Sequence, residues 1–128
     1  MKILGIGVDI IENKRIKSSI RNHKFKDRIY SPKELKQSIL SKDKVKYFSK
    51  RFAAKEAFAK ALGTGFRNNL NFKDIEIIND KLGKPYYTKT KKITKLIKKE
   101  FKVKSLNCFL SISDEKNYST AFTIIQSI

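Results

Sequence analysis

The segment from Lys42 to Leu62 constrains the fold most, because it is the longest helix candidate and Gly63 follows it as a natural C-terminal stop. At about 100° per residue, apolar side chains share one face of this helix: Val45, Phe48, Phe52, Ala59 and Leu62. Glu56 lies inside or at the edge of that face, and Lys60 follows one turn later. A carboxylate directed toward a core needs a cation or strong donors, whereas a surface Glu56–Lys60 pair would be an ordinary exposed ion pair.

The first segment, Lys2 to Ile10, is predicted to form a strand with two unlike faces. By the two-residue period, one face carries apolar side chains: Leu4, Ile6, Val8 and Ile10. The opposite face carries smaller groups and one acid: Ile3, Gly5, Gly7 and Asp9. Two glycines there let another backbone or a ligand approach closely. If the long helix crosses this face, Asp9 and Glu56 converge, and two carboxylates with open positions suit Mg²⁺. Spacing alone leaves this a hypothesis, because distant acids can be paired in any sequence.

The remaining patterns predict shorter elements around that helix. Two further helices are expected before it, at 12–22 and from an N-cap at Ser31 to about Ser41, and a lysine-rich amphipathic helix after it, at 90–103. Strands are expected at 72–78, 86–88, 106–113 and 118–128. Residues 1–128 are therefore predicted to form a single α+β domain, in which a mostly antiparallel sheet packs with the long central helix and the shorter helices.

The net charge of +18 is the strongest global property of the chain. Such a field attracts nucleic acid, an acidic membrane, an acidic protein or a polyphosphate, but much of the lysine excess can be compositional. No apolar run approaches the roughly 18–20 residues of a membrane span, and no cleavage site follows the short apolar start. Cys108 and His23 are the only residues of their kinds, which excludes an internal disulfide and metal sites built on several cysteines or histidines. We expect a cytoplasmic protein with no membrane partner.

Several segments resemble one known enzyme family, in order and along essentially the whole chain. The run Arg51–Gly65 (RFAAKEAFAKALGTG) resembles the signature of bacterial holo-[acyl-carrier-protein] synthases, in the 4′-phosphopantetheinyl transferase family. The opening Gly5–Ile10 (GIGVDI), followed by Arg15-Ile16, resembles their other hallmark. Further matches lie at 68–70, 79–85 and 110–115. The Arg51–Gly65 run is highly specific, whereas Gly-x-Gly-x-Asp alone would be weak.

The resemblance implies a reaction. The family transfers 4′-phosphopantetheine from coenzyme A to a serine of apo acyl carrier protein and releases adenosine 3′,5′-bisphosphate. Asp9 and Glu56 fall on its two metal-binding carboxylates, and Lys60 falls on a lysine directed at the phosphates. Charge spreads over the phosphoryl oxygens in the transition state, so Mg²⁺ and a lysine would offset it.

The resemblance also implies contacts with the nucleotide of coenzyme A. Arg51 and Lys55 are candidates for phosphate contact. The sequence Gly63-Thr64-Gly65 lets the backbone approach the nucleotide, in addition to ending the helix. Two other stretches resemble those that line the adenine and ribose-phosphate end: Lys84-Pro85 and Ser113-Asp114.

The general base is the point at which this chain departs from many relatives. Asp114 stands where many of them have histidine, although some have aspartate. An aspartate cannot donate as an imidazole does, and a phosphate repels it. A metal-associated water, or Glu56 acting through water, is the favoured acceptor of the serine proton. The departure also keeps open a relative that binds coenzyme A or carrier protein without turnover, although Asp9, Glu56 and Lys60 are intact.

The expected partners follow from the resemblance and the charge. Arg15, Arg21 and Arg28 fall where relatives bind the acidic recognition helix of the carrier protein, although they can also be plain solvated charges. The family usually forms homotrimers with active sites between subunits. The main alternative of another class is a basic nucleic-acid-binding domain. It would explain the charge and the aromatic residues, but not the acids at Asp9 and Glu56, and we expect no nucleic-acid partner.

Overall fold

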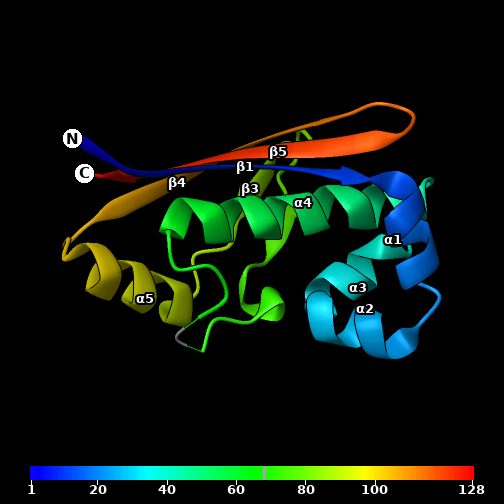
Figure 1. The fold of residues 1–128 in the computed structure, drawn as a ribbon, viewed down its shortest axis with the longest axis horizontal. Coiled ribbons are helices and arrows are strands. Elements are labelled where there is room, and N and C mark those ends of the chain that lie inside the picture. Colours follow the sequence, from blue (N-terminus) through cyan, green and yellow to red (C-terminus); the bar gives the residue numbers. More distant parts are fainter. Residues whose placement is uncertain (68) are drawn as a thin grey trace.

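The first and last strands of the chain lie side by side in one antiparallel sheet (Figure 1). This sheet has the order β1-β5-β4 and consists of β1 (Lys2–Glu12), β5 (Tyr118–Ser127) and β4 (Leu106–Asp114). In the computed structural model, residues 1–67 and 69–128 are described, so Asn68 of the predicted motif at 68–70 lies outside the described residues. The strands predicted near both termini are confirmed, and a short turn joins β4 to β5.

An irregularity near the start of β1 changes which residues share a face. The pairing with β5 shifts between Ile3 and Gly5. As a result Ile3 lies on the exposed face, and Leu4 packs against the core instead of pointing the same way as Ile6. Beyond this bulge the predicted alternation holds. Ile6, Val8 and Ile10 are more than half exposed, so the apolar face of β1 is turned away from the core.

The long helix α4 (Lys44–Leu62) packs on the other face of the sheet, and its backbone approaches that of β1 closely. A Cβ added at Gly5 would lie 1.8 Å from the carbonyl oxygen of Ala61, and one at Gly7 would lie 1.8 Å from that of Ala57. Any side chain at these two positions would push the helix away. The prediction that the glycines clear this face for another backbone is therefore confirmed.

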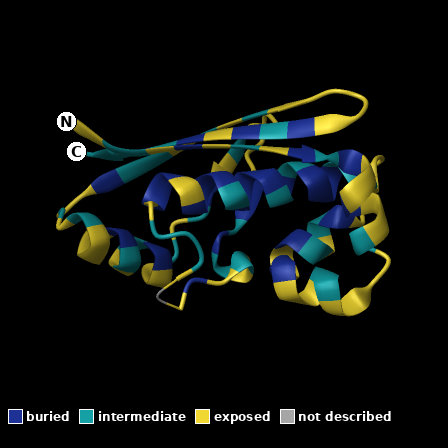
Figure 2. Ribbon diagram, in the orientation of Figure 1, coloured by how far each residue is buried: buried dark blue, intermediate teal, exposed yellow. Residues whose placement is uncertain are grey.

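The ends of α4 are set by local chemistry. The Asp43 side chain accepts a hydrogen bond from the Lys46 amide as N-cap. Gly63 ends the helix in the left-handed conformation with φ of 86°, which glycine adopts without a steric penalty. Most residues of α4 are buried, both toward the sheet and toward the short helices, and exposed residues gather on the outer surfaces of the short helices (Figure 2). The core is thus organised around α4.

Four short helices and a small hairpin complete the fold. Around one end of α4 lie α1 (Asn13–Ser19), α2 (His23–Ile29) and α3 (Pro32–Ser38), whereas α5 (Lys91–Phe101) lies near the other end. A two-stranded sheet is formed by β2 (Ile77–Asn79) and β3 (Pro85–Tyr87), and a 3₁₀ turn, η1, spans Phe72–Asp74. Of the helices in the described part of the chain, none combines the length and apolar character that crossing a membrane requires.

Three details of the sequence prediction were wrong. The single helix expected at 12–22 ends at Ser19, and α2 was not predicted at all. The signals for α2 were present, because the Asn22 side chain caps it and Phe25 and Ile29 are spaced one turn apart. The strand expected at 72–78 is a 3₁₀ turn followed by a strand that begins at Ile77. The α+β class with antiparallel pairing is nevertheless confirmed.

Candidate active site

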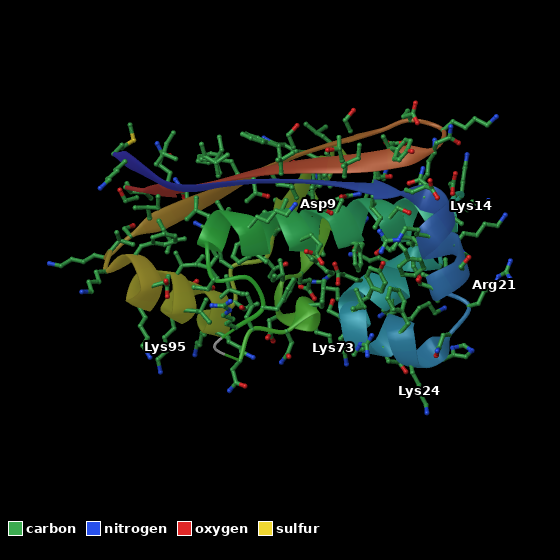
Figure 3. All side chains as sticks on the ribbon, in the orientation of Figure 1. Asp9, Lys14, Arg21, Lys24, Lys73 and Lys95 are labelled. Atoms are coloured by element: carbon green, nitrogen blue, oxygen red, sulfur yellow. The ribbon has the colours of Figure 1, made fainter. Side chains whose placement is uncertain are left out.

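Two carboxylates and one lysine meet where β1 crosses α4. Asp9 lies on the α4-facing side of β1 (Figure 3), and its backbone carbonyl accepts a hydrogen bond from Thr120 Oγ1 at 2.8 Å. Lys60 Nζ lies 3.1 Å from Asp9 Oδ1 and 3.0 Å from the carbonyl oxygen of Val8. Glu56 lies one turn before Lys60 on α4. Lys60 therefore pairs with Asp9 on the strand, which an ordinary surface pair between Glu56 and Lys60 would not predict.

Electrostatics couples the two acids. Burial raises the pKa of Glu56, the negative charge of Asp9 raises it further, and Lys60 opposes both effects. Glu56 is half-buried, and the Asp9 side chain is 16% exposed, so both carboxylates remain accessible from one side. Two oxygen-donor groups that repel each other and are only partly balanced by one lysine fit a hard cation such as Mg²⁺, which keeps other positions for water and phosphate. Within the described residues no group of three or more His, Cys, Asp or Glu forms such a site.

Lys55 does not fit the predicted phosphate contact. Its side chain is fully buried, and Nζ forms a 2.7 Å ion pair with Glu34 Oε1. The carbonyl oxygens of Phe72 and Ile75 accept its other hydrogen bonds. A phosphate could reach this ammonium only if the core opened, so the prediction for Lys55 is corrected to a structural contact.

Arg51 borders a basic cavity. Its guanidinium lies 3.7 Å from the centre of the Tyr47 ring, and its Nε is buried without a hydrogen-bond partner among the described residues. A cavity of about 490 Å³ next to it is lined by basic and polar groups, among them Lys46, Lys50 and Asn79. An anion held there would face three lysines, Lys42, Lys46 and Lys50, and an arginine. The sequence reasoning missed Lys46 and Lys50, although their spacing of four residues on the predicted helix was a signal.

The other predicted nucleotide residues lie at both ends of α4. Asp114 forms ion pairs with Lys46 at 3.3 Å and Lys50 at 4.0 Å, near the Arg51 cavity. Pro85 pairs with Asn79, which lines the same cavity, and Lys84 precedes it in the β2–β3 turn. Ser113 pairs with Thr120 in the sheet. By contrast, Gly63, Thr64 and Gly65 follow the C-terminal end of α4, about 18 Å along the helix from Arg51.

The family of the chain follows from comparison with known proteins. Residues 5–123 match the model of the 4′-phosphopantetheinyl transferase superfamily. The chain belongs to this superfamily. Two similar curated members are named holo-[acyl-carrier-protein] synthase. The one from Pelagibacter ubique is 60% identical over 98% of both chains. The one from Buchnera aphidicola is 44% identical, over 98% of this chain and 99% of that one.

Solved structures of superfamily members have the same fold. The holo-[acyl-carrier-protein] synthase of Neisseria meningitidis is 39% identical with a TM-score of 0.87, over 98% of this chain and 99% of that one. The synthase of Bacillus anthracis, solved in complex with coenzyme A (3′,5′-ADP), is 34% identical with a TM-score of 0.82 over the full length of both chains. These comparisons confirm the resemblance and the fold class that the sequence indicated.

The three arginines expected to meet a carrier protein lie on one end of the superfamily fold. Arg15 is exposed on α1, Arg21 in the turn after it, and Arg28 on α2. Arg21 lies at the outer edge of the molecule, between Lys14 and Lys24 (Figure 3). These positions are accessible to a protein partner. Their role in binding stays a prediction.

Proposed function

We propose that this chain transfers 4′-phosphopantetheine from coenzyme A to a serine of apo acyl carrier protein, as a holo-[acyl-carrier-protein] synthase. The products are holo carrier protein and adenosine 3′,5′-bisphosphate. The observation that carries the proposal is the meeting of Asp9, Glu56 and Lys60 on an accessible face, because phosphoryl transfer needs acids for a metal and a fixed positive charge. The names of its close relatives support the same reaction.

The proposed chemistry breaks one phosphorus–oxygen bond and forms another. The serine oxygen attacks the β-phosphorus of coenzyme A, and the bridging oxygen leaves with adenosine 3′,5′-bisphosphate. Asp9 and Glu56 are the residues that would hold Mg²⁺, which when bound supplies positive charge to the pyrophosphate oxygens. Lys60 adds an ammonium beside them, already oriented by Asp9 and the Val8 carbonyl.

Glu56 is the proposed acceptor of the serine proton, through a water molecule. Glu56 lies beside Asp9 and Lys60, and in the chain without metal, burial and Asp9 raise its pKa above that of an ordinary glutamate. Asp114 is a weaker candidate, because Lys46 and Lys50 pair with it. Of the two routes that the sequence left open, this one uses a carboxylate that already lies beside the proposed metal site.

The nucleotide end of coenzyme A is proposed to use the Arg51 cavity. Arg51, Lys46 and Lys50 present positive charge there, and an arginine can hold a phosphate with two parallel hydrogen bonds. Arg15, Arg21 and Arg28 are proposed to meet the acidic helix of the carrier protein, an attraction that weakens as salt increases. The cytoplasmic location expected from the sequence stays a prediction.

A homotrimer with active sites between subunits is proposed on two grounds. First, the sheet face turned away from α4 carries exposed apolar side chains: Ile3, Ile6, Val8, Ile10, Phe109 and Phe122. A face of this kind favours burial against another protein surface. Second, the nucleotide candidates divide between the Arg51 cavity and the Gly63–Gly65 loop, at opposite ends of α4. One coenzyme A would contact both groups more readily if a neighbouring subunit supplied one of them.

One preparation can test the reaction and the assembly together. Incubation with apo carrier protein, coenzyme A and Mg²⁺ should add one phosphopantetheine to the carrier, detected by its mass. Light scattering on the same enzyme sample should give three times the mass of the chain. Absence of product, together with tight binding to DNA, would overturn the proposed function in favour of a nucleic-acid-binding domain.

A further inference from the structure

A buried ion pair between Lys55 of α4 and Glu34 of α3 has no role in the proposed reaction. Lys55 and Glu34 are both fully buried, with 2.7 Å between Nζ and Oε1. Lys55 Nζ also donates to the carbonyl oxygen of Phe72 at 3.0 Å and to that of Ile75. An ammonium has three hydrogens, so each of them has an acceptor.

Glu34 connects three segments of the chain. Its Oε1 accepts from the Ser31 amide at 2.9 Å, which completes the capping box of α3, and its Oε2 accepts from the Ile77 amide at 3.1 Å. The ion pair adds Lys55 of α4 to this set. The start of α3, the middle of α4 and the entry to β2 are therefore fixed by one carboxylate and one ammonium.

Lys55 contacts the segment that leads from the glycine loop, Gly63–Gly65, to β2. Between Gly63 and Asn71 the described residues form no regular element, and η1 begins at Phe72, whose carbonyl Lys55 binds. The Phe72 ring stacks on Phe66 with centroids 3.9 Å apart and on Phe52 of α4 at 5.5 Å. Phe66 directly follows Gly65. The loop is thus fixed at one end by the α4 C-cap and at the other by the Lys55 contacts and this stack.

Stability alone does not account for such a pair. Two well-packed apolar side chains of similar volume stabilise a core as well as a buried ion pair or better, because the charges lose their hydration. An apolar pair, however, cannot donate to the carbonyl oxygens of Phe72 and Ile75. The distinctive effect of Lys55 is to specify the path of the backbone at these two residues.

We propose that Lys55 and Glu34 are positioning residues, which hold the described residues 63–67 and 69–75 in the shape that binds the donor coenzyme A. The inference rests on the proposed function, because it assigns the glycine loop to the donor. Lys55 precedes Glu56 in the sequence, yet it acts on the donor only through the loop. Loss of the pair therefore weakens donor binding more than it slows the chemical step.

The test separates positioning from stability with a double variant. Lys55→Met alone leaves the Glu34 charge buried without a partner and should lower Tm sharply. Lys55→Met with Glu34→Gln removes both charges and should regain most of the wild-type Tm. The double variant should still show a KM for coenzyme A raised about tenfold, with kcat and the KM for carrier protein within about threefold of wild type. Trypsin should also cut it faster after Arg67 and Lys73, which are exposed within the held segment.

Lys44→Met is the matched control. Lys44 Nζ also donates to three backbone carbonyls, those of Ser38, Ile39 and Ser41, but at the opposite end of α4. Its loss should not change the cleavage after Arg67. A double variant with wild-type Tm, KM and trypsin cleavage would overturn the inference. So would one that stays as unstable as Lys55→Met, because the pair would then hold the whole fold. Failure of the proposed function would be seen separately, as no transfer by the wild-type enzyme.

Discussion

Two of the lysine–carboxylate pairs of helix α4, whose lysines are five residues apart, differ in almost every other respect. Lys55 and Glu34 are 0% exposed and 2.7 Å apart, whereas Lys60 and Asp9 are 55% and 16% exposed and 3.1 Å apart. Because each residue turns the helix by about 100°, the two lysines point in directions about 140° apart. One pair faces the core and the other faces the edge of the sheet. The same residue types thus serve different purposes according to the side of the helix on which they lie.

The two pairs also differ in charge balance. The buried pair is neutral as a unit, and its ammonium has no unused hydrogen. The open group adds Glu56 to Asp9 and Lys60, so it carries one excess negative charge in a chain whose net charge is +18. This local excess raises the pKa of Glu56 and favours a cation. An unbalanced, accessible cluster indicates function, whereas a balanced and sealed one indicates architecture.

Replacing Glu56, in the open group of Asp9, Glu56 and Lys60, should have the largest effect on activity. Glu56→Gln removes a proposed metal ligand and base, and transfer to the carrier should fall by roughly a thousandfold or more, the size of effect seen when charge stabilisation in a transition state is lost. The measurement is kcat/KM by mass spectrometry of the carrier. Activity within tenfold of wild type would contradict the assignment of Glu56.

The same variant should be slightly more stable than the wild type when Mg²⁺ is absent. Glu56 has a raised pKa in the folded chain, so its ionisation costs folding free energy. This cost is absent below the unfolded-state pKa and is complete above the folded-state pKa. The gain in Tm for Glu56→Gln should therefore be present at neutral pH and vanish in acid. Added Mg²⁺ should raise the Tm of the wild type but not that of the variant.

Local patterns in the sequence were sufficient for most of the fold. The capping box at Ser31, the stop at Gly63 and the alternation in the terminal strands each depend on neighbouring residues, and each is confirmed. The approach of α4 to β1 was also predictable, because two glycines on one strand face leave room for a backbone. Short-range chemistry therefore specified both the elements and the contact that joins Asp9 to α4.

What the sequence could not show depends on residues far apart in the chain. Lys55 lies within the signature run, but its partner Glu34 is on another helix and its carbonyl acceptors lie beyond the glycine loop. No sequence periodicity connects these positions. The position of Lys55 within the family signature therefore suggested a phosphate contact instead. The bulge after Ile3 was equally invisible, because it depends on the register with β5. Tertiary pairing decided both cases.

A methyl group at Gly7 should disturb the open group and leave the buried pair intact. The Cβ of Gly7→Ala would lie 1.8 Å from the Ala57 carbonyl oxygen, so β1 must move away from α4. Overpacking of this kind costs about 1–3 kcal/mol, and the displaced Asp9 should reduce kcat. The control Gly83→Ala meets no atom within 4 Å but has φ of 85°, so it should show only the backbone cost of about 1 kcal/mol. Chemical denaturation measures both, and equal losses would contradict the close approach.

The smallest effect on activity is expected for a third set of charges, which is exposed. This set tests whether an accessible charged group is necessarily catalytic. Asp114 pairs with Lys46 and Lys50 beside the Arg51 cavity, and all three side chains are about one-third exposed. Exposed ion pairs contribute about 0.2–1 kcal/mol, so Asp114→Asn should hardly change Tm. It also frees two lysines for the donor phosphates, so the KM for coenzyme A should fall about two- to threefold at low salt, with kcat unchanged. A hundredfold loss of kcat would instead make Asp114 the base. The charges at Asp114 would then also be catalytic, and accessibility and charge balance would not distinguish the group of Asp9, Glu56 and Lys60 from neighbouring ion pairs.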